Sequence, residues 1–415
     1  MRIAVVGSGV AGLVAAWRLH RDHEVTLFEA DGRVGGHVHT RRVRGAGGDL
    51  AVDSGFIVFN ERTYPLFCGI LRELGVGSRE STMSFSVQVE ATGLEYGGST
   101  LDALFAQRRN LLRPSFHRMI RDILRFHREA RGLLEGAGAE RPLGEWIRGR
   151  RFSREFREHF LVPMASAIWS ADPAGIDAFP GRTLARFLDN HGMLQVEGRP
   201  VWRTVAGGSA TYVEAMTRGF RDRIRTSCPV TGIRRLPDRV RISFPGGVEV
   251  FDAVVVAAHA DQALRMLEDP SAAEAEVLGA FAFQRNDAVL HTDGSLLPRS
   301  RRARSAWNAF VPREAAGRAT LTYDMNVLQG LPGPEHWCVT LNRPGAPRED
   351  LVRERMVYHH PVLTTRAVEA QGRRRLVSGV RRTWYCGAWW GFGFHEDGVR
   401  SGLEAVEGIR AAAAS

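Results

Sequence analysis

The chain has 415 residues, of which 44% are hydrophobic and 25% are charged, so it is long enough to bury the cores of two domains. All 56 basic residues are arginine, and the formal net charge of +10 favours anionic partners, either phospholipid headgroups or nucleic acid. No apolar stretch reaches the roughly eighteen residues that a membrane-spanning helix needs, which excludes an integral membrane protein of that kind.

The sequence also indicates the compartment in which the protein lies and the kinds of partner it binds. The first apolar segment has no cleavage-site pattern behind it, so we expect a cytoplasmic protein. The four cysteines lie far apart and form no CxxC pair, so we expect neither a metal site nor a disulfide framework. Because the sequence contains no nucleic-acid-binding module, we expect no nucleic-acid partner and favour peripheral contact with the inner face of an anionic membrane.

The first thirty residues predict a nucleotide-binding βαβ unit. Residues 2–6 are typical of a buried strand, and residues 24–28 of a second strand that ends at Glu29. Between them, a GxGxxG turn opens an alanine-rich helix, whose free N–H groups would face a pyrophosphate. Glu29 would accept hydrogen bonds from the adenosine ribose, which disfavours NADP. The residues of the turn are Gly7, Ser8, Gly9, Val10, Ala11 and Gly12.

The segment after the second strand reads ExxxRxGG, from Glu29 and Ala30 to Gly36. It resembles the corresponding stretch of the flavin amine oxidase, phytoene desaturase and protoporphyrinogen oxidase superfamily. The resemblance implies an FAD-binding enzyme in which Arg33 lies near the pyrophosphate, while Gly35 and Gly36 let the backbone pass under the flavin. Many members have an arginine after the paired glycines, where this chain has His37.

Two further segments are assigned to the cofactor by the same resemblance. Residues 49–56 would enter the flavin site, with Asp53 and Gly55 matching a DxG core and Phe56 next to it; a β-hairpin with a structural aspartate is the alternative. Val230, in a later strand meander, matches the valine that packs beside the adenine and bonds to it through its backbone.

The middle of the chain looks like a substrate domain. Residues 111–134 form a helical pattern with a separate arginine stripe, which suits either an anionic membrane surface or a bundle helix with a solvated basic face. Residues 160–194 are rich in large apolar side chains and could line a tunnel over the flavin or fill a core. The arginines of the stripe are Arg118, Arg121, Arg125 and Arg128.

Near the C-terminus, a strand ending at Gly387 is followed by a spacer and by EDGxRSG, in the order of the superfamily's C-terminal motif. The resemblance implies that Asp397 binds a ribityl or phosphate-adjacent hydroxyl, and that the Gly398 and Val399 amides face the flavin at a helix N-terminus. His395 is the first candidate for a catalytic base because it lies between an aromatic stretch and this turn. The catalytic candidates are His395, His191, Trp389 and Trp390.

Taken together, these signals predict an α/β fold in which a Rossmann-like FAD-binding domain is interleaved with an α+β substrate-binding domain. We assign residues 1–84, 200–261 and 372–415 to the first domain, and residues 85–199 and 262–371 to the second. The motifs FHEDGxRSG, NHGML, RPxWRTVxGGS and VFN resemble more narrowly a bacterial subgroup of FAD/NAD-binding proteins found beside cyclopropane-fatty-acid-synthase-like methyltransferases.

Three functions are open at this point. The first is an FAD-dependent dehydrogenase or desaturase, with non-covalent FAD, acting on a long apolar substrate such as a methylated acyl chain of a membrane lipid. The second is an amine oxidase, although such enzymes commonly place a lysine opposite the flavin edge and this chain has no lysine. The third is a flavoprotein without net redox chemistry, either an isomerase or an accessory partner of a lipid methyltransferase.

Overall fold

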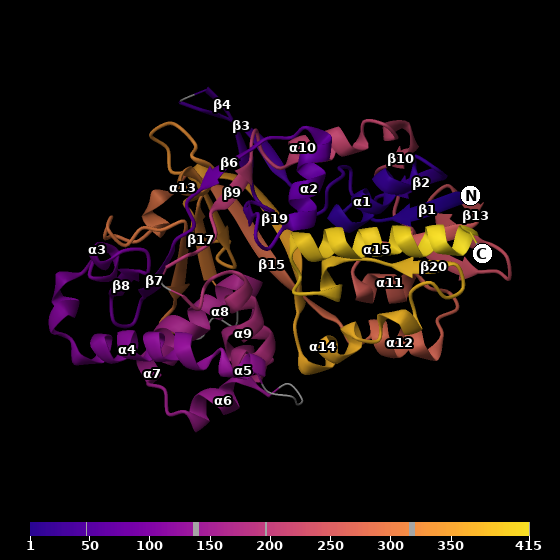
Figure 1. The fold of residues 1–415 in the computed structure, drawn as a ribbon. Coiled ribbons are helices and arrows are strands. Elements are labelled where there is room, and N and C mark those ends of the chain that lie inside the picture. The colour runs from indigo at the N-terminus through magenta and orange to yellow at the C-terminus, as the bar shows by residue number, and fades with distance from the viewer. Residues whose placement is uncertain (47, 136–140, 196, 315–319, 415) are drawn as a thin grey trace.

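The computed structural model describes residues 1–46, 48–135, 141–195, 197–314 and 320–414. Figure 1 shows the two termini at one end of the molecule and a group of helices, α4 to α9, at the other end. Within the described residues no helix is both long and apolar enough to cross a bilayer.

A five-stranded parallel sheet forms the end of the molecule that contains the termini. Its order is β10, β2, β1, β14, β20, so β1 is central and the chain leaves it in both directions. In such sheets a ligand binds beyond the carboxyl ends of the strands where the order reverses, which here is the end of β1. The strands are β1 (Arg2–Val6), β2 (Glu24–Phe28), β10 (Ile224–Arg225), β14 (Ala253–Val256) and β20 (Thr383–Tyr385).

The alternation of buried residues along β1 divides the core into two layers. Ile3 and Val5 belong to one hydrophobic cluster, with the helices α1 and α15, whereas Ala4 and Val6 belong to another, with α11, α12 and α14. These helices are α1 (Val10–Leu19), α11 (Ala260–Met266), α12 (Ala272–Leu278), α14 (Thr365–Gln371) and α15 (His395–Ala414).

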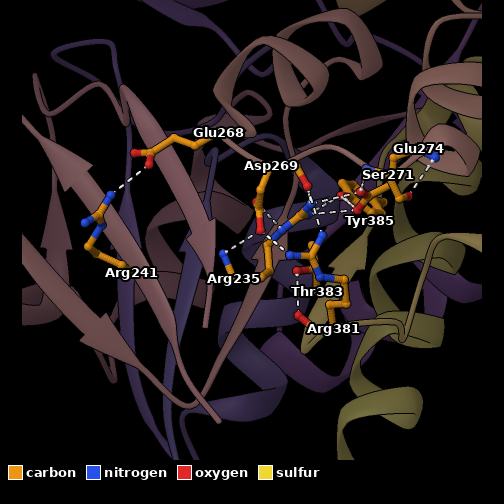
Figure 2. A network of polar contacts seen from close by, with 9 residues as sticks. All are labelled: Arg235, Arg241, Glu268, Asp269, Ser271, Glu274, Arg381, Thr383 and Tyr385. Atoms are coloured by element: carbon orange, nitrogen blue, oxygen red, sulfur yellow. Dashed lines mark hydrogen bonds and ion pairs between the residues drawn. The ribbon is translucent and has the colours of Figure 1, made fainter. Parts of the chain in front are cut away.

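A buried ion-pair network closes the second layer (Figure 2). The fully buried guanidinium of Arg235 donates to Asp269 at 2.8 Å and to Glu274 at 2.8 Å, and the hydroxyl of Tyr385 donates to Glu274 at 2.6 Å. The network joins β20 and α12 to a meander of β11 (Gly232–Arg235), β12 (Val240–Phe244) and β13 (Gly247–Phe251). Because each buried charge has a partner, the network costs less than an isolated buried charge would.

A seven-stranded mixed sheet occupies the middle of the molecule, in the order β19, β15, β18, β17, β16, β7, β8. Its strands come from residues 85–97 and 282–362, and only the β7 and β16 pair is parallel. They are β7 (Phe85–Val89), β8 (Leu94–Gly97), β15 (Ala282–His291), β16 (Trp307–Val311), β17 (Thr320–Asp324), β18 (Cys338–Leu341) and β19 (Val352–Val362).

Two small sheets and the remaining helices connect these parts. The predicted helix over residues 111–134 is shorter than expected: α4 ends at Glu129, and a separate turn of helix follows. The small sheets pair β3 (Thr40–Gly45) with β4 (Gly48–Asp53), and β9 (Trp202–Val205) with β5 (Phe59–Asn60) and β6 (Ser78–Ser81). The remaining helices are α2 (Pro65–Leu74), α3 (Leu101–Leu104), α4 (Pro114–Glu129), α5 (Gly132–Glu135), α6 (Leu143–Gly149), α7 (Arg154–Phe156), α8 (Val162–Trp169), α9 (Gly181–Asn190), α10 (Ala210–Thr217) and α13 (Met325–Gln329). No observation tests the domain boundaries, which stay a prediction.

Candidate active site

The glycine turn between β1 and α1 has the geometry that the sequence predicts for a phosphate cradle. A Cβ on Gly12 would lie 2.0 Å from the Gly7 carbonyl oxygen, and one on Gly7 would lie 2.8 Å from that of Ala257. A Cβ on Gly9, by contrast, would meet no atom within 4 Å. The open side of the turn is therefore at Gly9. It lies beside Val10 and Ala11, whose N–H groups are the first of α1, and an anion is favoured there.

Glu29 is held at the carboxyl end of β2 by Ser8, for which the sequence predicted no role of its own. The Ser8 N–H donates to the Glu29 carboxylate at 2.9 Å and the Asp31 N–H donates to it at 2.9 Å. The Ser8 hydroxyl also donates to Glu29 and accepts from the Gly35 N–H at 3.1 Å. Ser8 thus joins the glycine turn to Glu29 and to the loop that follows Glu29. Ala30, the first residue of that loop, is exposed.

The loop after Glu29 crosses directly over the glycine turn. A Cβ on Gly36 would lie 3.0 Å from the Gly9 Cα, and both Gly35 and Gly36 have positive φ angles, of 120° and 58°. The Arg33 guanidinium donates to the carbonyl oxygens of Gly36 at 2.8 Å and Val38 at 2.9 Å, so it holds the shape of this crossing.

His37 follows on the same loop and presents an unpaired polar atom. Its Nε2 is buried and has no hydrogen-bond partner in the described residues, and its ring stacks on Tyr358 at 5.2 Å and on His360 at 5.4 Å. Burial holds the pKa of His37 well below its ordinary value, with the neighbouring histidines adding to the effect. An unpaired buried nitrogen beside the glycine turn fits a bound phosphate group.

Asp53 faces protein groups and not the glycine turn. Its carboxylate accepts hydrogen bonds from Thr40, from the N–H and hydroxyl of Ser209, and from the Gln329 amide at 3.0 Å. Burial raises the pKa of Asp53 to about 6. This geometry favours the structural role that we left open for Asp53, joining β4 to the start of α10 and to α13.

Gly55 and Phe56 bring the same segment up to the loop and to α15. A Cβ on Gly55 would lie 2.1 Å from the His37 carbonyl oxygen, and the Phe56 N–H donates to that oxygen at 2.9 Å. The ring of Phe56 stacks on His395 with a centroid separation of 3.7 Å.

The N-terminus of α15 lies one turn earlier than we expected, because the helix starts at His395. The Gly398 N–H already donates to the Phe394 carbonyl at 3.1 Å, and Val399 lies inside the helix. The N–H groups that this helix leaves free are therefore those of His395, Glu396 and Asp397, and not those of Gly398 and Val399.

Glu396 and Asp397 are engaged by backbone groups at this helix end. Glu396 accepts from the N–H groups of Leu66 and Phe67, at 2.9 and 3.0 Å, and so caps α2. Asp397 accepts from Phe392 and Phe394, both at 3.0 Å, which fixes the turn before α15. Burial raises the pKa of Asp397 to about 6, consistent with a carboxylate held away from water.

The Gly398, Ser401 and Gly402 positions serve the contact between α15 and α1. A Cβ on Gly398 would lie 2.5 Å from the Val10 side chain, and one on Gly402 would lie 2.5 Å from the Ala11 carbonyl oxygen. Ser401 accepts from the Gly387 N–H at 2.9 Å, which ties the end of β20 to the helix. These contacts bring the two helix N-termini side by side.

Val230 is buried and its backbone is free. Its side chain is 9% exposed and packs in the cluster that contains Phe28 and Val256. Neither its N–H nor its carbonyl has a partner among the residues that the structure describes. A free peptide group beside a nucleotide-binding sheet fits the predicted contact with an adenine.

The structure separates the catalytic candidates. Trp389 packs on Phe281 in the cluster with α11 and α12, and its indole donates to the Ala258 carbonyl at 3.1 Å. Trp390 packs beside it at 4.2 Å. Both rings lie in the layer opposite α15, so the structure does not bring them together with the His395 side chain.

His395 is a weak base in this setting. It stacks on Phe56, contacts Phe67 edge-on at 4.8 Å, and its Nε2 bonds to the Tyr212 hydroxyl at 2.8 Å. Burial lowers its pKa to about 3. These contacts favour a role in packing and orientation.

His191 has the better geometry for accepting a proton. Its Nδ1 lies 2.9 Å from the Phe187 carbonyl, which can only accept, so Nδ1 carries the hydrogen and Nε2 carries the lone pair. Burial lowers the pKa of His191 to about 4, so the ring is neutral at pH 7. Its Nε2 has no partner among the described residues, and neither has the hydroxyl of Tyr64, whose ring lies 6.4 Å away.

Aromatic rings surround His191 and cover the turn before α15. Phe187 stacks on His191 at 3.9 Å and on Phe394 at 4.8 Å, and Trp169 donates from its indole to the Phe392 carbonyl at 2.9 Å. We call this group the aromatic cluster; its members are Trp169, Phe179, Phe187, His191, Trp202, Phe392 and Phe394.

Comparison with known proteins agrees with this geometry. Residues 10–291 match the family model for flavin containing amine oxidoreductases. Protoporphyrinogen oxidase 2 of Arabidopsis thaliana is 27% identical over 184 residues, a match that covers 41% of this chain and spans 33% of that protein's length.

Solved structures share the fold over nearly the whole chain. Cyclohexylamine oxidase from Brevibacterium oxydans IH-35A superimposes with a TM-score of 0.72 at 16% identity, covering 100% of this chain and 99% of its own. The CLA-producing fatty acid isomerase from P. acnes superimposes with a TM-score of 0.70 at 16% identity, covering 98% of each chain. At these identities the likeness confirms the α/β fold predicted from the sequence.

Proposed function

The chain belongs to the family of flavin-containing amine oxidoreductases, and on that premise we propose that it oxidises a long apolar substrate, a methylated fatty acyl chain of a membrane lipid. Family membership makes it an FAD-dependent oxidoreductase. FAD, when bound, supplies the acceptor for the hydride that leaves the substrate carbon. The space at Gly9, the buried nitrogen of His37 and the free backbone of Val230 are the features that would hold it.

The aromatic cluster is the observation that carries the proposal. Its rings lie against residues 392–394, immediately before the helix end that would face the flavin. A hydrocarbon chain gains free energy from contact with such a surface. The fatty acid isomerase named above is compatible with this choice, because its fold is the same and its name states a fatty acid.

Two polar atoms have no hydrogen-bond partner in the described part of the chain: the Nε2 of His191, within the aromatic cluster, and the hydroxyl of Tyr64, whose ring contacts His191. In the proposed reaction His191 accepts, at its Nε2 lone pair, the proton that leaves the carbon next to the hydride donor, and a carbon–carbon double bond forms. The ring of Tyr64 lies 6.4 Å from the ring of His191. A methylated chain would come from a lipid methyltransferase, which is the enzyme partner that the proposal implies.

Anaerobic reduction of the flavin tests the proposal. We expect vesicles that carry the methylated acyl chain to bleach the flavin absorbance, and mass spectrometry to show a product lighter by two hydrogen atoms. Putrescine and cyclohexylamine serve as controls, and neither should bleach it. Fast bleaching by an amine, with no response to lipid, would restore amine oxidation, and a lipid product of unchanged mass would indicate an isomerase.

A further inference from the structure

The basic side of α4 forms one wall of a surface hollow of about 400 Å³. The other wall is the segment from the end of α6 to the start of α7. Both walls belong to the helical end of the molecule, away from both termini (Figure 1). The lining residues are Arg118, Arg121, Asp122, Arg125, Arg151, Ser153, Arg154 and Glu155.

The hollow has an excess of positive charge. Five arginines face two carboxylates, which leaves a formal charge of +3. One of the carboxylates, Asp122, turns inward: it is 2% exposed and accepts from the Ser153 N–H at 2.8 Å. The other, Glu155, pairs with Arg118 at 2.8 Å. Outside the lining, Glu158 pairs with Arg154 at 2.9 Å and Glu129 pairs with Arg125 at 3.7 Å, so the remaining positive charge of the hollow comes from its other arginines.

Two of the five guanidinium groups are uncommitted. Arg121 and Arg151 are exposed, and neither has an acidic partner among the residues that the structure describes. Arg125 is held in place, because its guanidinium stacks 4.0 Å from the Phe152 ring centre and donates to the Arg150 carbonyl at 3.2 Å. Fixed and free arginines on facing walls form a site for the oxygens of a phosphate group.

Exposed leucines lie in the segment that leads into α4. Leu112 is 88% exposed, Leu101 is 76% exposed and Leu111 is 48% exposed. The ring of Phe105, just after α3, packs on Phe116 at 5.7 Å, which brings the end of α3 to the first turn of α4. Neighbouring exposed leucines and a basic hollow are the two components of a surface that docks on an anionic bilayer.

We propose that this hollow binds the phosphate of an anionic membrane lipid while Leu101, Leu111 and Leu112 enter the outer part of the acyl layer. The charge recognises the headgroup, and the leucines select a bilayer over a soluble phosphate or a nucleic acid, neither of which offers an apolar phase. Arg128 of the same helix does not line the hollow, so the site is narrower than the arginine stripe seen in the sequence. The inference concerns docking and does not depend on the identity of the oxidised substrate.

Flotation of the flavin-loaded protein with vesicles tests this site. We compare vesicles of phosphatidylcholine with vesicles that also contain phosphatidylglycerol, at two salt concentrations. The double variant Arg121→Gln/Arg151→Gln should bind the anionic vesicles about 25-fold more weakly, roughly fivefold for each arginine. The matched control is Arg375→Gln/Arg382→Gln, which removes the same charge from exposed positions near β20 and should bind like the wild type. Leu112→Ser should weaken binding about tenfold at both salt concentrations.

Each result bears on the proposal. Retention of flavin absorbance shows that a variant is folded, so weaker binding then reports the site itself. Equal loss in the two double variants would mean diffuse charge attraction, which overturns a specific hollow. Release by inorganic phosphate at matched ionic strength, or equally tight binding to duplex DNA, would overturn the lipid assignment, as would wild-type protein that ignores anionic vesicles.

Discussion

The glycine turn and the aromatic cluster lie on two sides of the same proposed flavin position and are built in opposite ways. In the glycine turn, backbone atoms approach so closely that a Cβ at Gly12 would overlap a carbonyl oxygen. A Cβ at Gly402, which packs on this turn from α15, would do the same. In the second, large rings such as Phe187 and Phe394 meet at ordinary stacking distances. Substitutions should therefore act abruptly in the first region and gradually in the second, since backbone contacts cannot yield but side chains can.

The largest effect is expected where α15 meets α1. Gly402→Ala should destabilise the protein by about 3 kcal/mol, because the new Cβ would lie 2.5 Å from the Ala11 carbonyl oxygen. Gly69→Ala is the matched control: Gly69 also lies inside a helix, but a Cβ there meets nothing within 4 Å, so stability should rise by up to about 1 kcal/mol. Thermal unfolding measures both, and equal responses would remove the contrast between crowded and open glycines.

The next effect separates cofactor binding from folding. Gly9→Val should leave the unfolding temperature of the cofactor-free protein unchanged, because the space beside Gly9 is open and its φ of −62° suits any residue. The side chain would fill the proposed pyrophosphate position, so the Kd for FAD should rise about 100-fold, equivalent to about 3 kcal/mol of overpacking. Flavin fluorescence titration measures this, and unchanged FAD binding would show that the nucleotide lies elsewhere.

The two histidines test the aromatic side of the comparison. His191→Gln should slow anaerobic reduction of the flavin by lipid at least about 100-fold, the usual contribution of a general base. His395→Gln should slow it less than about tenfold, because the Nε2 of His395 already bonds to Tyr212, whereas that of His191 has no partner in the described residues. Rapid-mixing absorbance gives both rates, and a larger effect at His395 would reverse the two roles.

The smallest effect is a difference in acid sensitivity. Burial lowers the pKa of His191 to about 4 from 6.5 in the unfolded chain, so the unfolded chain binds more protons between these pH values and stability falls as pH falls. From pH 7 to pH 5 this one group should cost the wild type about 2 kcal/mol. His191→Phe should therefore have a flatter profile of unfolding temperature against pH. Parallel profiles would mean that the ring is protonated without penalty.

The sequence predicted the fold around β1 and α1 well because its signal is carried by backbone requirements. Only glycine fits at Gly7 and Gly12, so the tight turn between the strand and the helix follows from spacing alone. The catalytic candidates fared differently. Trp389 and His395 are six residues apart but lie on opposite faces of the parallel sheet, and the sequence does not show which way the intervening turn leads.

Residues that act across long sequence separations were also missed. Ser8, Glu396 and Gln329 have no local pattern that marks them, because their partners are brought near by the fold. Asp53 illustrates the same limit: its motif was visible, but its partners Thr40, Ser209 and Gln329 decide its role. The start of α15 was misplaced by one turn for a related reason, since Asp397 fixes the preceding turn from inside the helix.

The capping of α2 by Glu396 has a consequence for the order of events during synthesis. Glu396 accepts hydrogen bonds from the N–H groups of Leu66 and Phe67, two residues that are synthesised some 330 residues earlier. The contact between α1 and α15 likewise waits for Gly398 and Gly402. On the ribosome, the nucleotide fingerprint stays without the helix that completes it until α15 has emerged. Cofactor capture should thus follow the synthesis of α15.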